Sequence, residues 1–426
     1  MAIEDEFEKK NGFPRSAATL ENWRRQPFSR WSFRNAAELV PSARIGTDAP
    51  RPLPQRVHNQ ELMASALRPG SDETVAWFLA RSQTDSFLMS RDGRIVAEWH
   101  ATGVEREDPH LVFSITKSIT ALVLAILEED GLIDPALSVG MILPETRNSA
   151  FGDATLRELL DMRVSLDFEE SYMSDGDYAR YRRAMLWNPP VPGQPDEGLF
   201  KMLCSLRKGE GPHGSAHAYQ SPNSDMLGIV IETLSGRRFP DLLSDLIWKP
   251  LGAYADAFLT VDRFGAPRTA GGFSCRPHDL LLLGEMMMNE GVGQSGRIVP
   301  ARFIEDMMKN GDEKIWAEGD QADFLPGGRY RSQWYQPLDY GYERFLVLGG
   351  EYSRDTFSLF DAAGTRVTEV DVTFRKADLA LGMEIGGNAE VRLIYARGYA
   401  TVDEQIGQPV APEGSVHQGG LAVQLV

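Results

Sequence analysis

Periodic apolar positions divide the chain into segments of predicted strand and predicted helix. Two short apolar runs, residues 86–90 and 95–99, flank an Asp-Gly pair, which is a common turn sequence of β-hairpins. Residues 114–130 carry apolar side chains along most of their length, and this run stops at Gly131. The sequence therefore predicts a strand pair followed by a long helix that is buried in the core.

Helical spacing dominates the middle of the chain, up to about residue 260. Residues 155–162 and 224–235 repeat apolar side chains every three or four positions, and residues 279–289 do the same before Gly291. Between the first two, residues 167–197 are dense in Tyr, Arg, Asp and Pro. This composition predicts a long functional loop or lid rather than core structure.

The last 90 residues or so carry short apolar or alternating runs separated by Gly and Asp, which predicts β-strands and no helix. The runs occupy residues 346–348, 357–360, 367–374, 379–385 and 391–395. The order of strands, then helices, then strands predicts an α/β (α+β) fold in which a helical lobe interrupts a sheet lobe.

The expected domain organisation follows from this order. An arm with several aromatic residues occupies residues 1–60 and is expected to lie on the larger body. Residues 61–125 and 261–426 are expected to form the sheet lobe, and residues 126–260 the helical lobe. Within the sheet lobe, residues 340–426 form the β-rich end of the chain.

Composition and charge exclude several classes of protein. The 426 residues are 42% hydrophobic and 25% charged, which is ordinary for a globular protein and excludes disorder as the main state. The 44 basic and 61 acidic residues give a formal net charge of −17. A surface this acidic repels phosphate backbones and anionic lipid, so we expect neither a nucleic-acid partner nor a membrane partner.

The two cysteines, Cys204 and Cys275, exclude a disulfide scaffold and a zinc site built from four cysteines. We expect two buried free thiols, with a single disulfide as the alternative. The first residues are acidic, and no run of about 18 apolar residues occurs, so we expect no signal peptide, no membrane span and a cytoplasmic location. The sequence leaves open whether the chain forms a homodimer.

Ser114 and Lys117 are the first candidates for chemistry. They stand three apart at the start of the predicted 114–130 helix and therefore share one face of it. A serine hydroxyl is a poor nucleophile until a base takes its proton, and a lysine can be that base when burial lowers its pKa from about 10.4. Ser205 and Lys208 show the same spacing, but the glycine-rich sequence after them predicts a solvated helix end.

Tyr219 is a second candidate, because it follows a glycine-rich loop, precedes a predicted helix and could shuttle the leaving-group proton. From the residues alone, a tyrosine packed at a helix start is the favoured alternative. His213 and His217 have a spacing that zinc can use, but no third ligand is evident, so we expect no metal. We expect Asp175 and Asp177 to be exposed acidic residues of a loop.

Several motifs in one order resemble the 6-aminohexanoate-dimer hydrolases, also called nylon-oligomer hydrolases. These enzymes belong to the serine β-lactamase and penicillin-recognising superfamily, near its class C and esterase branch. The resemblance runs over roughly residues 19–336. It is carried by Phe113-Ser114-Ile115-Thr116-Lys117-Ser118, Asp167 to Tyr172, Tyr219 with Ser221 and Asn223, Gly271 to Cys275, and Arg331 to Trp334.

The resemblance implies roles for individual residues. Ser114 matches the nucleophile, Lys117 its base and Tyr219 the general acid/base. Tyr172 matches a lid tyrosine that contacts the substrate amide, and Ser221 and Asn223 fall in the motif that borders the substrate. The nylon-oligomer enzymes have an acidic residue in the region of Asp175 and Asp177, which implies that these could bind a substrate ammonium group. The implied fold is a mixed α/β lobe with a central antiparallel sheet, packed against an all-helical lobe, with the site between the two lobes.

The sequence departs from the family at its third motif, where a strand carries Lys or His, then Thr, Ser or Gly, then Gly. The best candidate is the segment 346–352, which offers Gly349 and Gly350 but no basic residue. Gly350 is therefore the expected contributor of the second oxyanion donor. His417, followed by Gln-Gly-Gly, is similar to the motif but lies almost at the chain end.

These observations predict a serine hydrolase that needs no metal or organic cofactor. Its substrates are expected to be short amides, such as linear amide oligomers, or short-chain esters, which it would cleave through an acyl-enzyme. The altered third motif supports an alternative of another class, a non-catalytic relative that binds small amides or peptides.

Overall fold

The computed structural model describes residues 2–67, 72–170, 176–194, 197–323 and 325–336, and the backbone of further strands within residues 346–425. Tyr172, Asp175 and His417 lie outside the described residues, as do the predicted strand at 391–395 and most of the one at 379–385.

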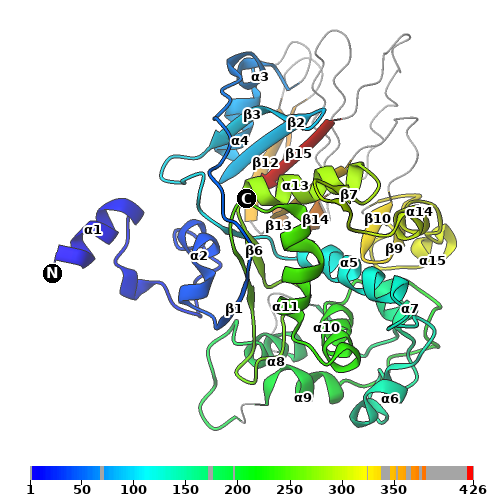
Figure 1. Ribbon diagram of the computed structural model, residues 1–426. Helices are drawn as coiled ribbons and strands as arrows, with labels where there is room; N and C mark the ends of the chain where they lie inside the picture. The colour runs from blue at the N-terminus through cyan, green and yellow to red at the C-terminus, as the bar shows by residue number, and fades with distance from the viewer. Residues whose placement is uncertain are drawn as a thin grey trace.

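A five-stranded sheet forms one side of the molecule, in the order β14-β11-β15-β2-β3 (Figure 1). Its strands are β2 (Ser86–Arg91), β3 (Arg94–His100), β11 (Leu346–Glu351), β14 (Ala377–Leu379) and β15 (Gly420–Leu425). β15 runs antiparallel to β2 and parallel to β11, and the other pairs are antiparallel. The end of the chain therefore joins the β-rich C-terminal part to the early hairpin.

A second sheet, antiparallel throughout, lies at the entry to the central helix, in the order β1-β5-β6-β4. Its strands are β1 (Ser42–Ile45), β4 (His110–Leu111), β5 (Ala257–Thr260) and β6 (Phe273–Cys275). The N-terminal arm thus contributes an edge strand, β1. The expected domain boundaries stay a prediction.

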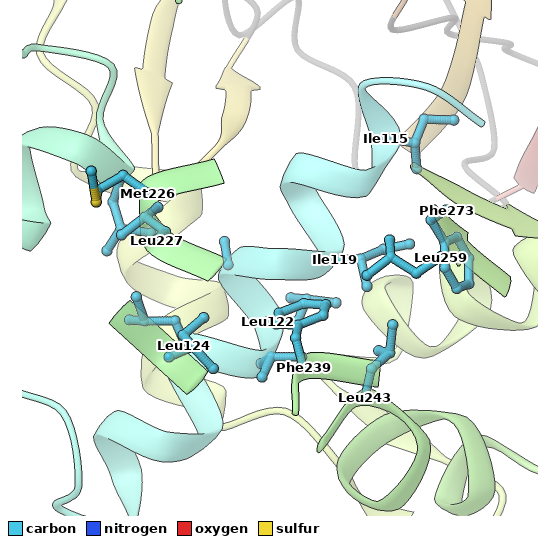
Figure 2. Packing of buried hydrophobic residues seen from close by; sticks show 14 of the residues in the cluster. Ile115, Ile119, Leu122, Leu124, Met226, Leu227, Phe239, Leu243, Leu259 and Phe273 are labelled. Carbon is cyan, nitrogen blue, oxygen red and sulfur yellow. The ribbon is translucent and has the colours of Figure 1, made fainter. Parts of the chain in front are cut away.

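The central helix α5 (Ile115–Glu129) is buried almost all round, as its near-continuous apolar sequence requires. Figure 2 shows its side chains in the main core. Ile119 lies against Leu259 of β5 and Phe273 of β6, and Leu122 lies against Phe239. α5 therefore packs against both the second sheet and the helices.

Helices between residues 139 and 251 pack around α5, and those between residues 139 and 235 gather on its far side from the five-stranded sheet (Figure 1). They are α6 (Val139–Ile142), η3 (Pro144–Thr146), α7 (Leu156–Leu160), α8 (Asp177–Ala184), α9 (Gly198–Cys204), α10 (Pro222–Ser235), α11 (Phe239–Leu243), the π-helical turn η4 (Ser244–Trp248) and α12 (Lys249–Leu251). A capping box between Thr155 and Glu158 fixes the start of α7. α13 (Pro277–Met288) instead covers the five-stranded sheet at β2, β11 and β15.

The remaining elements complete the fold. They are α1 (Ala2–Asn11), η1 (Arg15–Ala17), α2 (Ser29–Arg34), η2 (Ala36–Glu38), α3 (Gln60–Ala64), α4 (Val75–Arg81), β7 (Val292–Gly293), β8 (Gly296–Arg297), α14 (Ala301–Lys309), α15 (Glu313–Ala317), β9 (Arg329–Arg331), β10 (Trp334–Gln336), β12 (Arg354–Phe360) and β13 (Arg366–Thr373). The pairs β7–β8, β9–β10 and β12–β13 are antiparallel two-stranded sheets.

Most of the predicted elements are confirmed, and the α/β (α+β) fold class is confirmed with them. The predicted hairpin is β2–β3, and the predicted long helix is α5. The helices predicted at 155–162, 224–235 and 279–289 are α7, α10 and α13. One prediction is wrong in part, because residues 167–197 are not all loop. They include α8, whose Tyr178 and Tyr181 are buried in the core.

Candidate active site

Ser114 occupies the N-cap position of α5, at the point where the chain leaves β4. The residue before it, Phe113, has a φ of +45°, a backbone conformation that bulky residues rarely adopt. The Phe113 ring packs edge-on against Phe33, at 4.8 Å between centroids, and against Trp187, at 5.9 Å. Aromatic packing therefore fixes the tight turn that delivers the serine to the helix start.

Lys117 makes the central contact of the site. Its Nζ donates to Ser114 Oγ at 2.9 Å and to the carbonyl oxygen of Ala270 at 2.7 Å. Both Ser114 and Lys117 are buried, with 4% and 1% of their surface exposed. At this distance a proton can pass directly between the serine hydroxyl and the lysine amine.

Tyr219 borders Lys117. The centre of its ring lies 5.1 Å from Lys117 Nζ, and its ring stacks on Tyr335 with centroids 6.2 Å apart and planes 12° apart. Its backbone N–H is donated to both carboxylate oxygens of Asp320, each at 3.1 Å. The structure thus brings the three residues predicted for catalysis to one place.

The segment that carries Ala270 is held between α5 and α10. Thr120 on α5 donates its hydroxyl to the Thr269 carbonyl at 3.0 Å, and Thr269 donates its own hydroxyl to the Ser224 carbonyl at 2.8 Å. Gly228 of α10 lies so close to the Thr269 side chain that an added Cβ would overlap it. The acceptor that Ala270 offers to Lys117 therefore sits in a rigid wall.

A buried charge pair adjoins this wall, and the sequence analysis did not find it. Asp225 on α10 accepts the Ala270 N–H at 2.7 Å through Oδ1, while its Oδ2 accepts from Arg268 Nη1 and the Tyr181 hydroxyl. Burial is the largest influence on the pKa of the Arg268 guanidinium and lowers it, but the Asp225 carboxylate, together with Tyr181, Tyr178 and Glu170, raises it overall. Burial raises the pKa of Tyr181. A charged residue on the apolar 224–235 helix was the sequence signal for this pair.

Ser221 and Asn223 surround the start of α10 and are fully buried. Glu170 accepts from the Ser221 hydroxyl at 2.9 Å and from its N–H at 2.7 Å, so a carboxylate caps this helix terminus. Asn223 donates to the Gln220 carbonyl at 3.1 Å. Both side chains shape the turn after Tyr219, and their contact with substrate stays a prediction.

Gly350 lies on β11, where it is paired with Asp378 of β14, and β11 runs beside α5. Its role as an oxyanion donor stays a prediction, as does that of Tyr172.

The second Ser-x-x-Lys sequence is not a Ser–Lys site. The Ser205 hydroxyl donates to the Met202 carbonyl at 2.6 Å. Lys208 Nζ donates instead to the Asp153 carboxylate, also at 2.6 Å. The histidines His213 and His217 are likewise apart: the first contacts Asp153 at 3.0 Å, and the second packs between the rings of Trp316 and Tyr330. Within the described ranges, no three His, Cys, Asp or Glu side chains are grouped as metal ligands would be.

Other predicted features are also placed. Cys204 and Cys275 are free thiols, but only Cys275 is buried, so the expectation of two buried thiols is wrong for Cys204, which is half-buried. Its partial burial raises the pKa of Cys204 to about 11. Asp177 is exposed and lies 4.0 Å from Arg180. None of the helices in the described part of the chain has the length and apolar character needed to cross a bilayer.

Comparison with known proteins shows the family to which the chain belongs. The sequence matches the Beta-lactamase family over residues 72–323. It is 31% identical over 327 residues to the 6-aminohexanoate-dimer hydrolase of Paenarthrobacter ureafaciens, which covers 76% of this chain and 81% of that protein. Among solved structures, a Bacillus anthracis protein assigned as a 6-aminohexanoate-dimer hydrolase superposes with a TM-score of 0.69 and 24% identity. That match covers 76% of this chain and 84% of the other and shows that the two share a fold.

Proposed function

Because the chain belongs to the β-lactamase family, among the relatives of 6-aminohexanoate-dimer hydrolase, we propose that it is a serine hydrolase of short amides and short-chain esters. Linear amide oligomers are the favoured substrate class, since the relative that covers 76% of the chain is named for such a substrate. The observation that carries the proposal is the 2.9 Å contact between Lys117 Nζ and Ser114 Oγ.

Acylation begins when Lys117 is neutral, so that the Ser114 hydroxyl donates to Nζ instead of accepting from it. Ser114 Oγ attacks the substrate carbonyl carbon while its proton passes to Lys117. Negative charge develops on the carbonyl oxygen, and the Ser114 backbone N–H at the start of α5 stabilises that charge, with the N–H of Gly350 as the proposed second donor.

The tetrahedral intermediate then collapses, and the bond between the carbonyl carbon and the leaving group breaks. An amine leaving group needs a proton, which Tyr219 supplies and recovers from Lys117, because its ring lies beside Nζ. Water attacks the resulting ester, gives its proton to the same pair of residues and releases the acid, which restores the Ser114 hydroxyl.

The preference for amides and esters over β-lactams rests on the third motif. The segment 346–352 contains no basic residue, so no cation from this motif would pair with a substrate carboxylate. A buried carboxylate left without a partner costs about 1–3 kcal/mol or more. We therefore expect kcat/KM on a short-chain nitrophenyl ester, which has no carboxylate, to exceed that on a chromogenic cephalosporin, which has one. The aminohexanoate dimer, which also ends in a carboxylate, serves as the amide substrate.

The test compares two serine variants on these three substrates. Ser114→Ala should lose essentially all hydrolysis of the dimer and the ester, because loss of a nucleophile costs several orders of magnitude. Ser205→Ala is the matched control, since Ser205 has the same Ser-x-x-Lys spacing and is exposed, and it should keep wild-type rates. Residual turnover of Ser114→Ala above about 1% of the wild-type rate would contradict the proposed nucleophile.

The absence of a basic residue from segment 346–352 also favours a second candidate, a non-catalytic protein that binds small amides or peptides. This candidate predicts that wild-type protein binds the aminohexanoate dimer in a calorimeter without releasing monomer, and that Ser114→Ala binds it equally well. Release of monomer by the wild type eliminates it.

A further inference from the structure

The proposed mechanism leaves the buried charge pair behind Ala270 without a role. Asp225 and Arg268 form an ion pair with 0% and 4% of their side chains exposed. Burying such a pair carries a desolvation cost that its own attraction often fails to offset, so the pair is weak evidence for stability. Its location is specific, however, because it contacts the segment that binds Lys117.

Ala270 connects the pair to Lys117 through its own peptide groups. Its N–H is donated to Asp225 Oδ1 at 2.7 Å, and its carbonyl accepts from Lys117 Nζ at 2.7 Å. Arg268 lies two residues earlier in the same segment. Its guanidinium lies over the Trp187 ring, with Cζ 5.2 Å from the ring centroid. The Trp187 ring also packs on Phe113, just before Ser114. The pair therefore borders the lysine, and its arginine shares a neighbour with the turn that carries the nucleophile.

We propose that Asp225 and Arg268 are positioning residues for Lys117, which hold the Ala270 carbonyl against its amine and together keep the electrostatic potential there close to neutral. This inference rests on the proposed function. It adds a role for two residues that do not touch the reacting atoms.

The charges that face Lys117 define what each variant should do. The titratable neighbours include Ser114 and Tyr219 in contact with it and the Asp225–Arg268 pair behind Ala270. Tyr178, Tyr181 and Glu170 lie around that pair. With the pair intact, one negative and one positive charge oppose each other. Removing the positive charge leaves Asp225 to favour a protonated Lys117, and removing the negative charge leaves Arg268 to disfavour it.

The experiment measures the rate of fluorophosphonate labelling of Ser114 against pH in four proteins. Wild type should show an acid limb, along which labelling rises as Lys117 loses its proton. Arg268→Gln should move this limb to higher pH and Asp225→Asn to lower pH, each by about one pH unit for a charge at this range. The double variant Asp225→Asn/Arg268→Gln should return the limb close to its wild-type position.

Two controls separate this electrostatic effect from loose packing. Tyr181→Phe removes a hydroxyl that donates to Asp225 without changing any charge, so its acid limb should not move. Arg268→Lys keeps the positive charge and should also leave the limb in place, even where the labelling rate falls. If Asp225→Asn fails to fold, as judged by circular dichroism, the comparison of Arg268→Gln with Arg268→Lys still carries the test.

Each outcome decides the inference. Limb shifts of opposite sign in the two charge variants support it. A limb that stays fixed in Arg268→Gln, or that moves equally in Tyr181→Phe, overturns it while leaving the proposed function intact. A wild-type protein that is neither labelled nor active overturns the proposed function, and the inference with it.

Discussion

Trp23 donates its indole N–H to the backbone carbonyl of Trp187 at 3.0 Å, across 164 residues of sequence. The two rings also meet edge-on, with centroids 5.3 Å apart. Trp187 in turn packs on Phe113, the residue of positive φ that precedes Ser114. The N-terminal arm is thus part of the support behind the proposed nucleophile, in addition to supplying strand β1.

A substitution in the arm should therefore affect the site. Trp23→Phe removes the indole N–H, leaves the Trp187 carbonyl without this donor and creates a small cavity at a fully buried position. We expect a loss of about 1–3 kcal/mol in the free energy of unfolding, measured by urea denaturation, together with a lower kcat. Trp77→Phe is the control, because Trp77 is 41% exposed on α4 and should change stability by less than about 0.5 kcal/mol.

Lys117→Arg should remove activity while keeping a positive charge at the site. A guanidinium stays protonated at any working pH, so it cannot accept the proton of Ser114. We expect kcat to fall by about 10²–10⁴-fold, the usual contribution of a general base. Lys208→Arg, at the equivalent place in the second Ser-x-x-Lys sequence, should have wild-type kinetics. Near-normal turnover by Lys117→Arg would show that another group is the base.

Tyr219→Phe should slow amide cleavage more than ester cleavage. An amine leaves only when it gains a proton, whereas a nitrophenolate leaves without one. We expect the loss in kcat/KM on the aminohexanoate dimer to exceed the loss on a nitrophenyl ester by about tenfold or more. Equal losses on the two substrates would contradict the acid role and leave Tyr219 with a packing role against Tyr335.

Asp279, on the first turn of α13, should make stability depend on pH. Burial raises the pKa of its carboxyl from 3.8 to about 7, although the backbone N–H groups of Tyr254 and Ala255 oppose the shift. The folded state therefore keeps a proton that the unfolded chain has released, so this contribution is complete below about pH 4 and is lost as pH rises toward about 7.

Asp279→Asn isolates this effect, because an amide has no charge to bury and can still accept the Tyr254 N–H. Urea denaturation at pH 5 and pH 8 should show that wild type loses about 3 kcal/mol relative to the variant over this range. Other titrating groups, such as His278, are common to both proteins and cancel in the difference. A wild-type-to-variant difference that does not change with pH would contradict a buried, protonated Asp279.

Local patterns in the sequence predicted the elements that depend on local residues. The β2–β3 hairpin followed from its turn, and α5 from its apolar run. α8 was missed because its buried face is built from Tyr178 and Tyr181, whose hydroxyls make the segment look polar although their rings pack in the core. β1 and β15 were missed because such short strands are stabilised by hydrogen bonds to partner strands that are distant in sequence.

The same limit applies to the site. Ser114 and Lys117 are three residues apart on one helix, so their spacing alone indicated a contact. The contact of Lys117 with Ala270 joins residues 153 apart, and that of Arg268 with Asp225 joins residues 43 apart. Contacts of this kind are made by tertiary packing and leave no spacing in the sequence. A charged residue on a predicted apolar helix, such as Asp225, is the one signal that could have been followed.

The most direct test of the central claim is to locate the residue that reacts with a fluorophosphonate. Intact-mass and peptide mass spectrometry of the wild-type protein should show one added phosphonyl group, on Ser114, and labelling should disappear in Ser114→Ala and persist in Ser205→Ala. Only a serine activated by a neighbouring base reacts in this way. A wild-type protein that stays unlabelled, or one that carries the group on a different residue, would contradict a Ser114–Lys117 nucleophile.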